Sequence, residues 1–308
     1  MRCNARPSVT AACAVLVLVL LGNTVSGWLM AWAGVSYDSW LYYLLSTLLQ
    51  WIVSALPVFV YYGRIAPGRA SALRLNRLDP LCAVLTALSA AVGVLALNYV
   101  ALYWTVFLRL LGLSPLAGTP APSSPAMLVC MLVSVVCTAG VVEELVFRGL
   151  LLPALEPLGE RRAVAWSALL FMLMHLSVEV MPTHFLIGAV LALLALRTGS
   201  LYAPMLFHGV YNGVIVLLQY ALRSQAAAEP TAAQALSLLP GALLMLWAWY
   251  GLLSLALRRG AQTSLCTLAH ADGERFVRPR WYVAAPLGLL LAAGMFLAFV
   301  SMLPGGAP

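Results

Sequence analysis

Long apolar segments constrain this chain more than any other feature of its sequence. We predict nine helices from them, at about residues 9–31, 39–62, 80–111, 126–152, 163–178, 184–197, 202–222, 235–257 and 281–303. A helix of about 20 apolar residues crosses the hydrocarbon core of a bilayer, and shorter helices are tolerated inside a bundle. The fifth and sixth segments are the short ones. The sequence therefore predicts an all-α, polytopic transmembrane helical bundle of eight or nine spans.

The charge content excludes a soluble protein. The chain is 63% hydrophobic and 9% charged, whereas about 25% of the residues of a soluble domain are charged. All 17 basic residues are Arg, and they are spread over short loops without interleaved exposed aromatics, so no nucleic-acid surface is indicated. The lipid bilayer is the predicted environment of the chain.

The distribution of Arg predicts the orientation and the division of the chain. With the N-terminus in the cytosol, fourteen Arg lie in inside segments and one, Arg223, lies outside. This asymmetry satisfies the positive-inside rule, so we expect an inner (cell) membrane protein whose first helix is an uncleaved anchor. We divide the chain into three N-terminal spans with an outer loop (1–125), a central core (126–222), and C-terminal helices with a cytosolic loop (223–308).

Charged side chains inside the fourth segment are the first sign of function. Ionisable residues are costly in the bilayer and usually face a functional cavity. Glu143, Glu144 and Arg148 stand there among apolar neighbours. Glu144 and Arg148 are four residues apart, so they share a helix face and can form an ion pair. Glu143 points about 100° away from Glu144, which leaves its carboxylate free for other work, and we place it in the cytosolic half of its helix.

Two further helices carry polar groups. His175 follows Phe171 at a distance of four residues, and His208 precedes Asn212 at the same distance. Each group alone is explained as well by hydrogen bonding between helices, which His and Asn often provide in membranes. Together with Glu143 they supply a base, an imidazole partner and two donors. A carboxylate and an imidazole can deprotonate a water, and paired donors can stabilise an oxyanion, so the set predicts amide hydrolysis.

The pattern E-E-x-x-x-R, F-x-x-x-H and H-x-x-x-N on three membrane helices resembles the CPBP (CAAX protease and bacteriocin-processing, also Abi) family of intramembrane endopeptidases. The resemblance covers about residues 126–222 and includes the stretch from Arg197 to Pro204. It implies that Glu143 activates water with help from His175. His208 and Asn212 match the oxyanion residues, and the supporting residues are Glu144, Arg148 and Phe171. It implies neither a metal ion nor another cofactor.

The resemblance leaves the substrate open. It implies a membrane protein or membrane-anchored peptide, and protein maturation or C-terminal sorting in a bacterium fits the composition. Three alternatives remain: a zinc protease that uses Glu143, His175 and His208, a non-proteolytic scaffold or immunity protein of this family, and a transporter. The zinc alternative lacks the H-E-x-x-H spacing.

The other histidines and the cysteines are predicted to lie outside the site. We expect His184 at the outer end of the sixth helix, at the membrane interface and far from the cytosolic half, and His270 in the last cytosolic loop. The six cysteines contain no C-x-x-C pair and lie mostly in apolar runs, so we expect neither disulfides nor a sulfur-ligated zinc ion.

Overall fold

The computed structural model of the chain describes residues 6–36, 38–115, 120–225, 231–264 and 276–304. His270, Cys3 and Cys266 lie outside the described residues. Within the described residues the chain forms helices and no strand. The helices outside the central segment are α1 (Val9–Trp32), α2 (Trp40–Gln50), η1 (Trp51–Ala55), α3 (Leu56–Val60), η2 (Tyr61–Ile65), η3 (Pro67–Leu73), α4 (Pro80–Leu110), α11 (Ala232–Ser237), α12 (Leu239–Thr263) and α13 (Trp281–Ser301).

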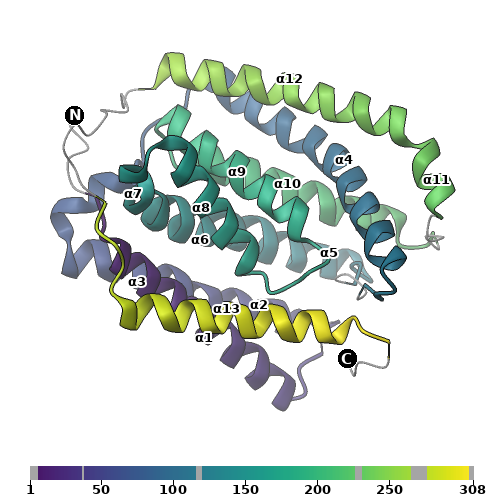
Figure 1. The fold of residues 1–308 in the computed structure, drawn as a ribbon, viewed down its shortest axis with the longest axis horizontal. Coiled ribbons are helices and arrows are strands. Elements are labelled where there is room, and N and C mark those ends of the chain that lie inside the picture. The colour runs from purple at the N-terminus through teal and green to yellow at the C-terminus, as the bar shows by residue number, and fades with distance from the viewer. Residues whose placement is uncertain (1–5, 37, 116–119, 226–230, 265–275, 305–308) are drawn as a thin grey trace.

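The central segment contains one long composite helix and three simple ones. The composite helix is built from α5 (Pro125–Met131), η4 (Leu132–Ala139), α6 (Gly140–Glu144), η5 (Leu145–Leu151), α7 (Leu152–Leu155) and η6 (Glu156–Leu158). It is followed by α8 (Glu160–Leu173), α9 (Met181–Thr198) and α10 (Tyr202–Leu222). On one side of this segment α4 packs against α9, α10 and α12, and on the other α1 packs against η5, α7 and α13. Figure 1 shows the central helices between these two outer groups.

Eight helices of the described chain are long and apolar enough to cross a membrane. The predicted all-α, polytopic bundle is therefore confirmed. The predicted fifth span is the exception, because α8 has only 14 residues and ends at Leu173 rather than near residue 178.

The direction of the first and last helices indicates that the described part of the chain, with the short α8 included, passes through the bundle nine times. The backbone N–H of Arg280, at the start of α13, donates to the Thr10 hydroxyl near the start of α1, at 3.2 Å. The two helices therefore run side by side in the same direction, as Figure 1 shows. Because successive spans alternate in direction, parallel first and last spans require an odd number of passes. The short α8 is the ninth.

Ion pairs gather at one end of the bundle. Arg74 contacts Glu156 at 2.6 Å and Arg6 contacts the same carboxylate at 3.3 Å. The Glu156 side chain is 6% exposed, so these contacts are shielded from water. They connect the chain before α1 and the segment after η3 to the end of the composite helix.

Asp79 makes a second connection at this end. It accepts two hydrogen bonds from Arg259 of α12, at 2.8 and 3.0 Å, and one from the Cys82 backbone N–H at the first turn of α4. The hydrogen bonds from Arg259 lower the pKa of Asp79 below its ordinary value. The start of α4 and the end of α12 are thereby held together.

The buried position of Glu156 predicts that its charge matters for stability. Glu156→Gln leaves the Arg74 guanidinium buried without its partner, which we expect to lower the free energy of unfolding by about 3 kcal/mol. The measurement is thermal unfolding of the purified chain in detergent micelles. Glu160→Gln is the matched control, because the Glu160 ion pair with Arg197 is half exposed and is worth about 0–1 kcal/mol. Equal losses in both variants would contradict the prediction.

Candidate active site

The composite helix changes its winding on both sides of the two glutamates. α6, which carries Glu143 and Glu144, is a single α-helical stretch of five residues between the π-helical segments η4 and η5. Wider π turns are rare in proteins and occur frequently at functional sites. The π-helical backbone on both sides of Glu143 and Glu144 therefore indicates a functional site in the same stretch as the charged residues do.

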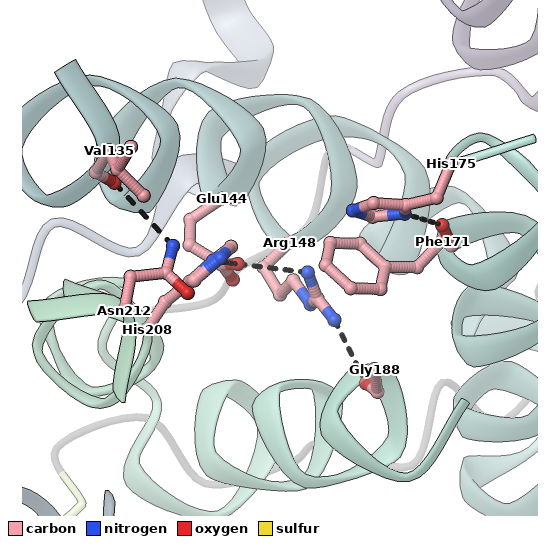
Figure 2. A network of polar contacts seen from close by, with 8 residues as sticks. All are labelled: Val135, Glu144, Arg148, Phe171, His175, Gly188, His208 and Asn212. Atoms are coloured by element: carbon pink, nitrogen blue, oxygen red, sulfur yellow. Dashed lines mark hydrogen bonds and ion pairs between the residues drawn. The ribbon is translucent and has the colours of Figure 1, made fainter. Parts of the chain in front are cut away.

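Glu144 holds three helices together through one carboxylate oxygen. Its Oε1 accepts from Arg148 Nη1 at 2.9 Å and from His208 Nδ1 of α10 at 2.8 Å. Arg148 also donates through Nη2 to the Gly188 carbonyl of α9 at 2.9 Å. Figure 2 shows this chain of contacts. The Glu144 and Arg148 side chains are completely buried, so the ion pair predicted from their spacing is confirmed.

Two glycines allow the helices to approach closely enough for this contact. A Cβ atom at Gly140 would lie 3.1 Å from the backbone nitrogen of Gly209, which is closer than most side chains tolerate. Gly140 stands one turn before Glu144, and Gly209 follows His208. The missing side chains let α6 touch the backbone of α10 just where the carboxylate meets the imidazole.

Phe171 lies at the centre of the polar cluster. The Arg148 guanidinium carbon lies 4.6 Å from the centre of the Phe171 ring, close enough for a cation–π interaction. The centres of the His175 and His208 rings lie 4.9 and 5.9 Å from it. The Phe171 ring therefore lies next to both histidines and the guanidinium, and Figure 2 shows it beside Arg148 and His175.

Glu143 points to a different side of the helix from Glu144. It lines a cavity of about 140 Å³ together with His175, Phe147 and Met174, which is room for several water molecules. The Glu143 Oε2 atom is buried and has no hydrogen-bond partner among the described residues. One cavity therefore contains an unpaired carboxylate and an imidazole.

The hydrogen bond of His175 determines which of its ring nitrogens can act as a base. His175 Nδ1 lies 2.8 Å from the Phe171 carbonyl oxygen. A carbonyl oxygen only accepts, so Nδ1 carries the hydrogen, and Nε2 of the neutral ring keeps its lone pair. Figure 2 shows Nε2 on the side of the ring away from this bond. The arrangement leaves His175 able to accept a proton.

Asn212 and His208 lie one turn apart on α10, but both already have a partner. The Asn212 amide nitrogen lies 3.5 Å from the Val135 carbonyl oxygen, a long and weak hydrogen bond. His208 uses Nδ1 for Glu144. The groups that remain for a ligand are Nε2 of His208 and the second amide N–H of Asn212.

His184 stands at the predicted end of its helix, but it belongs to this cluster, so the prediction that it lies outside the site is wrong. Its ring centre lies 4.0 Å from that of His175 and 6.3 Å from that of Phe171. Its Nδ1 lies 3.1 Å from the Val180 carbonyl oxygen. The error follows from the early end of α8: the connection to α9 turns back beside His175, and α9 begins at Met181, so His184 stands in its first turn.

Comparison with known protein families identifies the same part of the chain that contains the site residues. Residues 125–214 match the family model described as type II CAAX prenyl endopeptidase Rce1-like. The match contains all the site residues of the composite helix, α8, α9 and α10. No curated protein and no solved structure matches the chain.

The glycine contact between α6 and α10 predicts a steric effect on stability. Gly140→Val places a branched side chain against the Gly209 backbone, and we expect the free energy of unfolding to fall by about 1–3 kcal/mol. The measurement is thermal unfolding in micelles. Gly251→Val on α12 is the matched control, because a Cβ there meets nothing within 4 Å. The prediction fails if the two variants unfold at the same temperature.

Proposed function

From the Rce1-like, CPBP-type core at residues 125–214, we propose that this chain is an intramembrane endopeptidase that hydrolyses a peptide bond with a water activated by Glu143 and His175. The match supports a peptidase of the CAAX-protease kind. One observation supports the mechanism above all others: Glu143 and His175, which are 32 residues apart in the sequence, line the same cavity. An unpaired carboxylate beside a free imidazole nitrogen is the arrangement that general-base catalysis needs.

In the proposed reaction, water loses a proton to the Glu143 carboxylate while its oxygen adds to the carbonyl carbon of the scissile bond. His175, through Nε2, holds the second hydrogen of that water. The carbon–nitrogen bond then breaks, and the proton on Glu143 passes to the departing amine. The products are a carboxylic acid and an amine, which together carry both hydrogens of the water, and no group on the protein is consumed. The chain's own contribution is to position water and to move one proton.

The oxyanion of the intermediate requires donors, and His208 and Asn212 are the residues that we assign to it. His208 donates from Nδ1 to Glu144, so donation from Nε2 requires the doubly protonated, charged ring. The Glu144 carboxylate, which Arg148 also contacts, accepts the Nδ1–H of that ring and so stabilises its charged form. The role that we propose for Arg148 is to hold the Glu144 carboxylate in position beside His208 without taking part in the reaction.

We further propose that the substrate is a membrane protein or a membrane-anchored peptide, and that cleavage serves protein maturation or C-terminal sorting. The depth of the cavity in the bundle supports a substrate that is itself embedded in the membrane. Glu143 lies 18 residues after Pro125 and 15 residues before Leu158 on the composite helix, which is close to its midpoint. The distribution of Arg supports an inner (cell) membrane location with the N-terminus in the cytosol.

Removal of the proposed base is the first test of this function. Glu143→Gln keeps the size of the side chain and removes the base, so we expect cleavage to fall at least about a hundredfold with unchanged thermal unfolding. The measurement is proteomics of the membrane fraction from cells that carry each variant, with uncut precursors expected to accumulate. Glu160→Gln, the same change outside the cavity, should leave precursor levels as in the wild type. A scaffold or transporter would show no accumulation with Glu143→Gln.

A chelator distinguishes the proposed water activation from the zinc alternative. The precursor that accumulates with Glu143→Gln serves as the substrate for the purified wild-type chain in proteoliposomes. We expect cleavage to continue at the same rate after exhaustive treatment with EDTA and 1,10-phenanthroline. Loss of activity that zinc restores would replace the proposed mechanism with a metal-dependent one.

The packing of His184 against His175 predicts a positioning role. His184→Ala removes the ring that limits the movement of His175, and we expect kcat to fall on the order of tenfold to a hundredfold with little change in KM. His184→Phe keeps a ring of similar width and should retain most of the activity. The measurement is cleavage of the same precursor in proteoliposomes. Wild-type kcat in His184→Ala would contradict the role, and so would equal losses in the two variants.

A further inference from the structure

The cavity that contains Glu143 has a second polar wall, built from helices outside the family-matched segment. Asn23 of α1, Gln50 at the end of α2 and Ser54 of η1 line it. Gln50 and Ser54 are four residues apart and therefore share a helix face. Polar side chains within membrane spans are costly and usually mark a functional path. The role of this wall is not explained by the activation of water.

Hydrogen bonding between helices is the simplest explanation for Asn, Gln and Ser in a membrane, but it does not account for Gln50. The Gln50 Oε1 atom is buried and has no hydrogen-bond partner among the described residues. The Oε2 atom of Glu143, in the same cavity, has none either. Gln50 and Glu143 line one cavity, and each has an acceptor that no described residue satisfies, so the cavity can bind a ligand that donates hydrogen bonds.

The packing of the N-terminal helices keeps this wall in place. A Cβ atom at Gly22 would overlap the Val53 side chain, so the glycine allows α1 to lie directly against η1. Asn23 follows Gly22, and Ser54 follows Val53. The close contact therefore brings the two polar side chains to the same level of the bundle.

The depth of the wall indicates which kind of donor enters. Gln50 stands ten residues after Trp40 in a helical run that continues to Ile65, so it lies roughly 15 Å from the start of the span. Lipid at that depth offers no hydrogen-bond partner, so any backbone there must satisfy its polar groups within protein or in a cavity that holds water. A transmembrane helix does so by itself and has no free N–H to offer. An unwound peptide has free N–H and C=O groups.

We propose that Asn23, Gln50 and Ser54 form a binding site for the backbone of an unwound, membrane-embedded peptide segment, opposite Glu143. This inference rests on the proposed function and specifies its substrate. The Gln50 amide accepts from a peptide N–H and donates to a peptide carbonyl, while Asn23 and Ser54 bind the neighbouring peptide units. Segments with Gly or Pro near the scissile bond are preferred, because these residues unwind a helix most easily.

Photo-crosslinking tests the binding site directly. A photoreactive amino acid, p-benzoylphenylalanine, replaces Gln50 in the Glu143→Gln background, where uncut precursors accumulate. We expect light to join position 50 to those precursors, at the peptide segment next to the cleavage site. Leu48, which is 51% exposed on the same helix, is the control position and should give at least tenfold less product. Equal capture at positions 48 and 50, or no capture at position 50, would overturn the site.

Kinetics of Gln50→Leu separate this inference from the proposed function. The loss of a peptide hydrogen bond should raise KM roughly threefold to tenfold and change kcat little, in proteoliposomes with the accumulated precursor. Thermal unfolding should not be impaired, because the variant removes an unpaired polar group. If Glu143→Gln blocks cleavage while Gln50→Leu and Asn23→Leu leave KM unchanged, the binding site is wrong and the protease remains. If Glu143→Gln has no effect, both are wrong.

Discussion

The shared carboxylate oxygen of Glu144 is the contact on which the site depends. Oε1 meets Arg148 within its own helix and His208 on α10, and Arg148 continues to the Gly188 carbonyl on α9. In a bilayer, a buried charge without these partners would cost several kcal/mol, so the three helices are held in one register. The glycine contact between Gly140 and Gly209 makes the necessary approach possible.

The same contact explains why two adjacent glutamates can have different roles. Glu144 is neutralised by Arg148, is fully enclosed and has no direct path to a substrate. Glu143 lies on another side of the helix, where it lines a cavity, and its Oε2 atom has no hydrogen-bond partner among the described residues. A single helix therefore carries both a fixed counter-charge and a free base. The two glutamates have different surroundings because successive residues of a helix are rotated by about 100°.

The sequence was most informative where a physical cost made residues conspicuous. Apolar length predicted the spans, and the spacing of Glu144 and Arg148 predicted their ion pair. His184 was misplaced because hydropathy does not show that α8 ends at Leu173, so that the chain turns back beside His175. Gln50 and Asn23 were missed because each stands alone in an apolar run. Only the packing of Gly22 against Val53 places them around one space.

We infer that Glu143 faces a cavity inside the bundle that water can enter, and cysteine accessibility tests this placement most directly. The six native cysteines are replaced by alanine, and the substitution Glu143→Cys is then introduced. This variant is treated with a small, charged, water-soluble thiosulfonate. Thiols react as thiolates, which form only in contact with water. We expect modification many times faster than at Val133→Cys, because position 133 lies on the same helix but is 51% exposed on the outer surface of the bundle. Equally slow modification at both positions would contradict the claim.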